Sequence, residues 1–243
     1  MKIGIAQIQP LAGDIEYNIR RHSEAITQAA QQQADALFFP ELSLTGYEPA
    51  LASTHAMTLE DDRLASFYKL SQQHNITLGI GLPLLTNLGI QIAMLICQPN
   101  ATPQIYGKQL LHDDEKPFFV PGHQQVMINI HNYLIGPAIC YESLQESQLQ
   151  NVINKGAHIY LASVAKSASG TQQALASFSN FSKKYNVPIL MVNSVGPCDN
   201  FVAAGQSAIW SSEGILIGQL SSDVDGILIF DVEKEAQPTI LLV

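Results

Sequence analysis

The fold class of this 243-residue chain is decided by the stretch Leu134-Ile135-Gly136-Pro137-Ala138-Ile139-Cys140-Tyr141-Glu142-Ser143. Its first part is a short apolar run, which is typical of a buried strand. A helical pattern begins near Ser143, directly after the cysteine. A side chain at such a strand-to-helix turn is exposed at the sheet edge, as in a nucleophile elbow. A lone cysteine is more often a small buried apolar residue, so the rest of the chain must decide its role.

A similar arrangement occurs near the N-terminus. Ile3-Gly4-Ile5-Ala6, a helical stretch and the apolar run 34–39 match residues 135–138, a helical stretch and the run 156–161. The hairpin patterns at 103–110 and 213–220 match as well. Two β-α-β halves with hairpins predict two mixed sheets face to face, with helices covering the outer faces.

Hydrophobic periodicity places the remaining elements. Strands are predicted at 3–8, 36–39, 76–82, 90–97, 104–107, 126–130, 133–139, 158–162, 189–193, 207–210, 215–220 and 226–231, and helices at 16–33, 61–74, 143–155 and 172–185. The tail after Glu235 is expected to wrap a neighbouring surface or subunit. No linker or low-complexity segment interrupts the chain, so we expect a single domain spanning 1–243.

Composition narrows the function classes. Apolar residues make up 47% and charged residues 14%, as in a globular protein with a sizeable core. The net charge of −9, without a basic cluster, argues against nucleic-acid binding. The separated Cys97, Cys140 and Cys198 form neither a disulfide framework nor a CxxC site. With no signal-peptide pattern or membrane-length apolar run, we expect a cytoplasmic protein without membrane contact.

Three chemistry-bearing residues stand where predicted strands end. Glu41 follows the strand 36–39, and partial desolvation there would raise its pKa and suit general acid–base work. Lys108 follows the strand 104–107 and would stabilise an oxyanion. Backbone N–H groups after Cys140 are expected to lower the thiol pKa and to bind an oxyanion. Taken singly, Glu41 is also explained as a solvated loop glutamate, Lys108 as a surface lysine and Cys140 as a buried apolar residue.

Together the residues resemble the nitrilase, or carbon–nitrogen hydrolase, superfamily. The resemblance rests on Phe39–Tyr47, on Tyr106-Gly107-Lys108 with Glu115 and Pro121-Gly122 after it, and on Ile139-Cys140-Tyr141-Glu142. Further along, Asn193, Gly205-Gln206-Ser207 and Gly214 also match. The family implies a four-layer α-β-β-α sandwich, in agreement with the duplicated pattern, and a homodimer or larger homo-oligomer.

The resemblance implies roles for four residues. Cys140 would be the nucleophile, Glu41 the general base and acid, and Lys108 the oxyanion stabiliser. Glu115 would hold Lys108 or position substrate and water. The chain departs from the family at Leu110, where His is common, in the arginine missing from 177–181, and in the loop 163–167, so a particular substrate is not carried over.

Substrate-binding candidates are less specific. Tyr47 is either a pocket wall or a packed aromatic ring, and the backbone N–H of Tyr141 would join the oxyanion site. Lys166 is either a surface lysine or a ligand for a substrate carboxylate. Ser163 and Asn193 are further candidates for the pocket lining.

The resulting hypothesis is an enzyme that hydrolyses C–N bonds of small linear amides through a thioester. The alternatives are an N-carbamoyl hydrolase, an ω-amidase or a nitrilase using the same site, or a silent scaffold of the same fold. A glutamine-dependent synthetase is disfavoured, because a nucleotide-binding domain has no room in 243 residues. A His-based cysteine protease has no arrangement of histidines to support it. No cofactor or metal is expected, and Asp113-Asp114-Glu115 is taken as a solvated turn.

Overall fold

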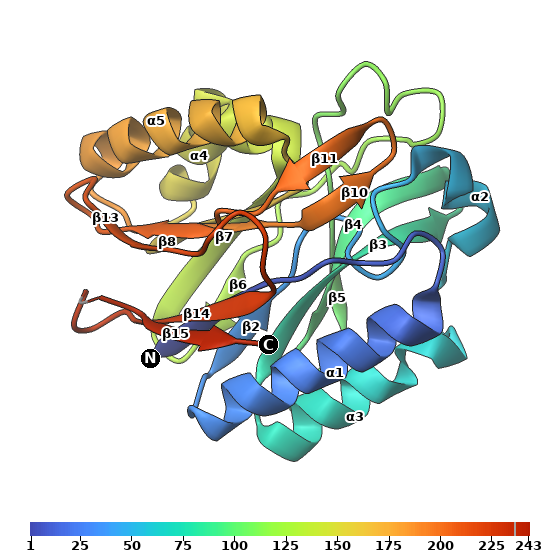
Figure 1. The fold of residues 1–243 in the computed structure, drawn as a ribbon, viewed down its shortest axis with the longest axis horizontal. Helices are drawn as coiled ribbons and strands as arrows, with labels where there is room; N and C mark the ends of the chain where they lie inside the picture. The colour runs from blue at the N-terminus through green and yellow to red at the C-terminus, as the bar shows by residue number, and fades with distance from the viewer. Residues whose placement is uncertain (236) are drawn as a thin grey trace.

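The computed structural model describes residues 1–235 and 237–243. Two mixed β-sheets pack face to face between two helical layers, with α4 and α5 over one sheet and α1 and α3 over the other (Figure 1). The fold is therefore the predicted α-β-β-α sandwich. The helices are α1 Ile15–Gln31, α2 Ala52–His55, α3 Ala65–His74, α4 Glu146–Asn154 and α5 Ala168–Tyr185, with short 3₁₀ helices η1 Pro49–Leu51, η2 Asp62–Leu64 and η3 Cys140–Leu144.

The strands fall into two large sheets and one hairpin. In order across the first sheet they are β15 (Thr239–Leu242), β14 (Gly226–Asp231), β1 (Lys2–Gln7), β2 (Ala36–Phe38), β3 (Thr77–Thr86), β4 (Gly89–Cys97) and β5 (Gln104–Gly107). Across the second they are β13 (Leu216–Gln219), β12 (Ala208–Trp210), β9 (Ile189–Asn193), β8 (Ile159–Val164), β7 (Tyr133–Ile139) and β6 (Ile128–Ile130). The hairpin is β10 (Val195–Cys198) with β11 (Phe201–Ala204).

The sequence repeat reappears as a repeat of topology. In the first sheet β1, β2 and β3 are parallel, and β4 and β5 follow antiparallel. In the second sheet β7, β8 and β9 are parallel, and β12 and β13 follow antiparallel. The two halves therefore place the carboxyl ends of equivalent strands in equivalent positions.

Three apolar clusters separate the four layers. The central cluster lies between the sheets and includes Ile5, Phe38, Ile135 and Leu161, which are fully buried. Burial of each such side chain contributes about 1.5–3 kcal/mol. The outer clusters join α1 and α3 to the first sheet and α4 and α5 to the second. Docking of the two sheets therefore depends on the central cluster.

Several parts of the chain differ from the sequence-based expectation, among them the unpredicted short helices η1 and α2 and the predicted helix 61–74, which is divided into η2 and α3. The β10–β11 hairpin was not predicted, because Gly196 and Pro197 interrupt the apolar alternation that marks a strand. The predicted helix 143–155 is divided into η3 and α4. The tail after Glu235, expected on a neighbouring surface or subunit, adds β15 to its own sheet through pairs such as Gly226 with Leu242.

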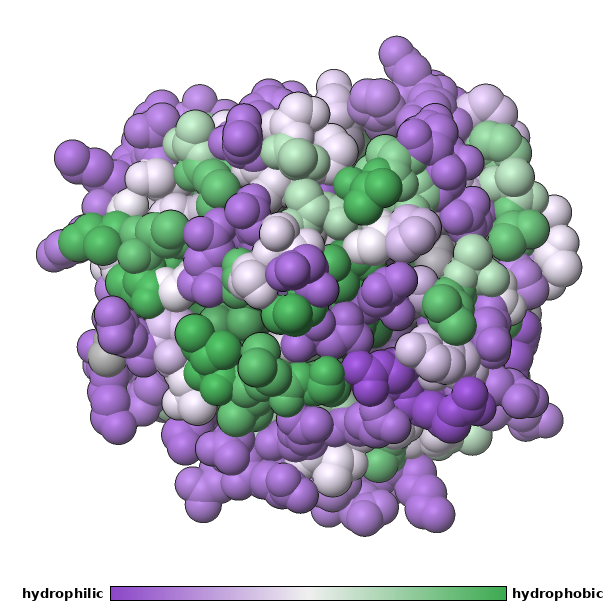
Figure 2. Space-filling view, in the orientation of Figure 1, coloured by the Kyte–Doolittle hydropathy of each residue, from purple (hydrophilic) through white to green (hydrophobic). Residues whose placement is uncertain are grey.

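The outer edge of the first sheet carries exposed apolar side chains. Ile240 is 54% and Leu242 72% exposed, and Figure 2 shows apolar side chains gathered around this end of the chain. Among residues 1–235 and 237–243, no helix combines the length and the hydropathy that crossing a bilayer requires.

Candidate active site

Glu41, Lys108 and Cys140 meet at the carboxyl ends of strands from both sheets. Glu41 and Lys108 follow β2 and β5 of the first sheet, and Cys140 follows β7 of the second. The ammonium of Lys108 donates to Glu41 Oε1 at 2.7 Å and to Glu115 Oε1 at 2.6 Å, and all three side chains are buried. The sheet-to-sheet packing thus brings residues about 100 positions apart into one cluster.

A tight turn over β3 fixes the position of Glu41. Leu42 adopts a left-handed conformation with φ 51°, and the N–H of Leu44 donates to the carbonyl of Gly81 at 2.9 Å. A side chain at position 81 would collide with the carbonyl of Pro40 and the N–H of Leu42. Glycine at 81 is therefore what allows the turn to lie against the sheet.

Cys140 stands on a strained strand-to-helix turn. Its φ of 49° is left-handed, which is unfavourable for a non-glycine residue and concentrates at functional sites. The residue ends β7 and begins η3, and its Sγ donates to the carbonyl of Ala165 at 3.6 Å. The turn exposes the thiol to a pocket, as the elbow-like sequence pattern predicted.

Burial sets the protonation state of Glu41. Desolvation raises the pKa of Glu41 to about 7, with Lys108 opposing the rise and Glu115 adding to it. Its Oε2 is buried and has no hydrogen-bond partner within the described residues. A carboxylate with a free oxygen and a pKa near neutrality is suited to accept and return a proton.

The thiol behaves differently from the sequence-based expectation. Burial, followed by the negative charge of Glu41, raises the pKa of Cys140 to about 11, against smaller lowering effects of Lys166 and Lys108. The expected lowering by backbone N–H groups is therefore outweighed by desolvation and by the carboxylate. Near neutral pH Cys140 is a thiol and Glu41 is only partly ionised, so attack requires transfer of the thiol proton to the carboxylate form of Glu41.

Lys108 remains charged although it is buried. Desolvation lowers its pKa, but the charges of Glu41, Cys140 and Glu115 outweigh that effect and raise the pKa above its ordinary value. An ammonium has three N–H donors, and the two carboxylates occupy two of them. The third is free to bind a developing oxyanion.

Glu115 joins Lys108 to the pocket wall. Its Oε1 accepts from Lys108 and from the Tyr47 hydroxyl at 2.9 Å, and its Oε2 accepts the N–H of His112 at 2.8 Å. The carboxylate therefore orients both the ammonium and a ring that faces the pocket.

Glu142 belongs to the sequence motif around Cys140, and the sequence alone does not indicate its role. Its buried carboxylate accepts from the Tyr106 hydroxyl, from the N–H of Ile139, and from the N–H groups of Gln109 and Leu110. It therefore ties the segment after Lys108 to the turn that carries Cys140. Its place three residues beyond the apolar strand end is the one sequence signal for this role.

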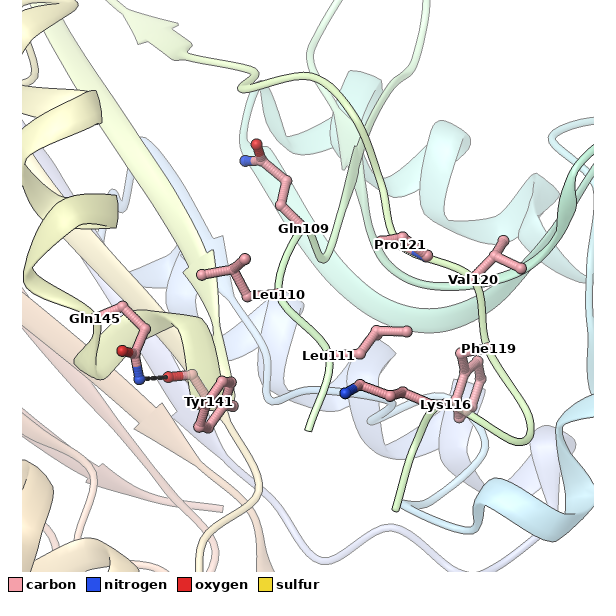
Figure 3. Close-up of a pocket in the computed structure, with 9 residues that line it drawn as sticks. All are labelled: Gln109, Leu110, Leu111, Lys116, Phe119, Val120, Pro121, Tyr141 and Gln145. Atoms are coloured by element: carbon pink, nitrogen blue, oxygen red, sulfur yellow. Dashed lines mark hydrogen bonds between the residues drawn. The ribbon is translucent and has the colours of Figure 1, made fainter. Parts of the chain in front are cut away.

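A cavity of about 600 Å³ opens above the thiol, and a smaller hollow of about 540 Å³ lies beside it. The larger hollow is lined by Tyr47, His112, Asp114, Glu115, Cys140, Tyr141, Leu144, Gln145, Ala165, Lys166, Ser167, Gly170, Gln173 and Phe201. Tyr141 and Gln145 also line an adjacent, more apolar hollow, with Phe119 and Val120 on its opposite wall (Figure 3). The thiol lies in the larger hollow, which is the candidate substrate pocket.

The five substrate-binding candidates divide into two groups. Tyr47, Tyr141 and Lys166 line the pocket. Ser163 and Asn193 lie behind the lining: Ser163 Oγ donates to the carbonyl of Phe39 at 2.8 Å, and the fully buried Asn193 bonds to the backbone of Lys166. These two residues support the pocket wall from behind.

Within the part of the chain that the structure describes, no group of three His, Cys, Asp or Glu side chains is arranged to hold a metal ion. Asp114 Oδ1 lies 2.7 Å from His112 Nδ1, and Asp113 forms an ion pair with Lys116, so two of the acidic residues in this turn contact neighbouring polar side chains.

Comparison with known proteins agrees with this arrangement. The carbon–nitrogen hydrolase family profile matches residues 2–240. The glutamine-dependent NAD(+) synthetase of Acinetobacter baylyi is 27% identical to this chain over 96% of the chain and 45% of the synthetase. That of Thermotoga maritima is 24% identical over 100% of the chain and 44% of the synthetase. The chain therefore spans less than half the length of these two relatives. The amidase of Nesterenkonia sp. AN1 has the same fold, with TM-score 0.87, 22% identity, and coverage of 95% of this chain and 92% of its own. That amidase has been solved with butyramide and with an acetamide moiety on its active-site cysteine.

Proposed function

Because this chain belongs to the carbon–nitrogen hydrolase family, we propose that it hydrolyses small linear amides through a thioester on Cys140. The observation that carries the proposal is the buried Glu41 carboxylate beside the Cys140 thiol: its Oε1 is held by Lys108, and among residues 1–235 and 237–243 its Oε2 has no geometric hydrogen-bond partner. A buried polar atom without a partner is unfavourable. We assign Oε2 as the atom that accepts the proton from the thiol or from water and returns it to the leaving amine or to the sulfur.

The first half of the reaction forms the thioester. Glu41 accepts the thiol proton as Sγ bonds to the carbonyl carbon, and the carbonyl oxygen becomes negative. The third N–H of Lys108 and the backbone N–H of Tyr141, in the first turn of η3, stabilise this oxygen. Glu41 then gives its proton to the nitrogen as the C–N bond breaks, and ammonia leaves.

The second half releases the acid. Glu41 takes a proton from water, and the oxygen of that water adds to the thioester carbon. The same two donors stabilise the second oxyanion. The C–S bond then breaks, the thiol regains its proton from Glu41, and a carboxylic acid departs. Glu115 keeps Lys108 in place through both halves.

Cys140→Ala separates this proposal from a silent scaffold. Ammonia release would be measured over short aliphatic amides, carbamoyl amino acids and nitriles, together with the intact mass of the protein after rapid acid quenching. We expect hydrolysis of one or more amides, a transient mass increase equal to the acyl group, and loss of both in Cys140→Ala. Absence of acylation across the whole panel would favour the scaffold, and preference for carbamoyl compounds or nitriles would favour those alternatives.

A second candidate is hydrolysis of the glutamine side-chain amide. The observation in its favour is that the first relatives named above are glutamine-dependent synthetases that match this chain over nearly all its length. The chain spans less than half of each relative, and the reaction proposed for it under this candidate is release of ammonia from glutamine. Adding glutamine to the panel tests this candidate directly.

We further propose that residues 1–243 act as one domain and assemble into a homo-oligomer. The exposed Ile240 and Leu242 on β15 offer apolar surface for association. Light scattering of the purified protein tests the assembly, and a monomer at micromolar concentration would contradict it.

A further inference from the structure

Lys166 is a largely buried cation whose side chain has no partner in the part of the chain that the structure describes. It lies between β8 and α5, lines the pocket beside Cys140, and is only 8% exposed. All its hydrogen bonds are made by its backbone. Within residues 1–235 and 237–243, no carboxylate lies within ion-pair distance of its Nζ. The ammonium keeps contact with the solvent of the pocket, so an anion bound there would pair with it in a partly dehydrated setting.

The other lysine of the site is already matched. Lys108 bonds to Glu41 and Glu115, and His112 lies 2.7 Å from Asp114. Among the described residues, the Lys166 ammonium therefore remains able to pair with an anionic group of a bound ligand.

The position of Lys166 is fixed by its surroundings. Asn193 Oδ1 accepts the N–H of Lys166 at 2.8 Å, and Asn193 Nδ2 donates to its carbonyl at 3.2 Å. The N–H of Ala204 donates to the same carbonyl at 2.9 Å. The backbone of Lys166 is therefore held on both sides, which fixes the point from which its side chain reaches the pocket.

The start of α5 adds positive potential at the same place. Ser167 caps this 18-residue helix, and Ser167 and Gly170 of its first turn line the pocket with Lys166. The first N–H groups of a helix favour anions, as does the helix dipole. Two independent features therefore favour negative charge on this wall.

We infer that Lys166 binds a carboxylate on the acyl part of the substrate, so that the preferred substrates are amides whose acyl chain carries an acid group. This inference rests on the proposed amide hydrolysis and narrows its substrate class. Monoamides of short dicarboxylic acids belong to the class, and glutamine carries the same carboxylate.

The test compares two amides of equal chain length, glutaramate and valeramide, which differ in the terminal carboxylate. In the wild-type protein kcat/KM for glutaramate is expected to exceed that for valeramide by about 10- to 100-fold, the range of a charge-assisted hydrogen bond. Lys166→Met is expected to lower the glutaramate value by about the same factor more than the valeramide value. Lys166→Arg, which keeps the charge, is expected to keep most of the preference.

Lys116→Met is the matched control. This lysine lines the adjacent hollow, is exposed, and pairs with Asp113, so its loss should leave the ratio of the two amides unchanged. Equal wild-type rates for the two amides, or an equal loss of both in Lys166→Met, would overturn the role of Lys166 while leaving amide hydrolysis intact. Absence of hydrolysis and of Cys140 acylation with both amides would instead refute the proposed function.

Discussion

Replacement of Glu41 by Gln removes the proposed proton acceptor with almost no change in shape. Lys108 keeps its bond to Glu115, so the ammonium should remain in place. A general base contributes about 10²- to 10⁴-fold to a rate. With a thiol pKa near 11, only about one molecule in 10⁴ carries a thiolate at pH 7 without help. We therefore expect kcat/KM of Glu41→Gln to fall by 10²- to 10⁴-fold at pH 7.

The pH dependence gives a second, independent signature. Because the carboxylate form of Glu41 is the base, wild-type kcat/KM should fall about tenfold per pH unit below its pKa of about 7. In Glu41→Gln that limb disappears. The rate should instead rise toward alkaline pH as the thiol itself ionises, and loss of the neighbouring negative charge brings this ionisation to lower pH.

The same substitution should stabilise the fold. The pKa of Glu41 is higher in the folded state than in the unfolded state. Protonated Glu41 therefore contributes to the free energy of unfolding fully below about pH 4.5, and this contribution is lost as the pH rises through about 7. Ionising the buried carboxylate is therefore unfavourable in the folded state, and Gln avoids that cost. Thermal unfolding should show the variant more stable at pH 8, with a smaller gap at pH 5. A variant with full activity at pH 7 and an unchanged pH profile would refute the assignment of Glu41 as the base.

Two further substitutions test how the site is held. Glu142→Gln weakens four hydrogen bonds that join the segment after Lys108 to the Cys140 turn. We therefore expect the free energy of unfolding to fall by about 2–4 kcal/mol, measured by denaturant titration, and kcat to fall at least about tenfold. Unchanged steady-state kinetics would count against this role of Glu142. Gly81→Ala forces the Glu41 turn away from β3. We expect the free energy of unfolding to fall by about 1–3 kcal/mol because of overpacking, and kcat to fall about 10²-fold because Glu41 is misplaced. A variant with wild-type kcat would show that the turn adapts.

Much of the fold was readable because its strands are short, continuous apolar runs. β7 was predicted with its observed bounds, Tyr133–Ile139, and β5 likewise, Gln104–Gly107. The duplicated β-α-β pattern led to the four layers. By contrast, β15 follows Pro238 near the chain end, and its pairing with β14 is a long-range contact that local periodicity does not reveal.

The candidate site was readable for a different reason. Its three principal residues stand at strand ends, where chain order alone suggests proximity. The pKa of Cys140 was not readable, because it depends on burial and on the distance to Glu41. The burial of Lys166 was also hidden, since the same side chain on an open loop would be an ordinary surface lysine. Asn193 and Ser163 could be selected as important, but their support role depends on hydrogen bonds that only three dimensions define.

One consequence follows from the origin of the reacting groups on opposite sheets. The acid–base pair Glu41 and Lys108 belongs to one half of the duplicated fold, and Cys140 belongs to the other. Neither half, expressed alone, would contain all three catalytic side chains. A shift of about 1–2 Å between the two sheets would also separate the Glu41 carboxylate from the Cys140 sulfur. During gradual denaturation, turnover should therefore vanish while most of the helical circular-dichroism signal persists, which would make enzymatic rate a sensitive gauge of alignment between the halves.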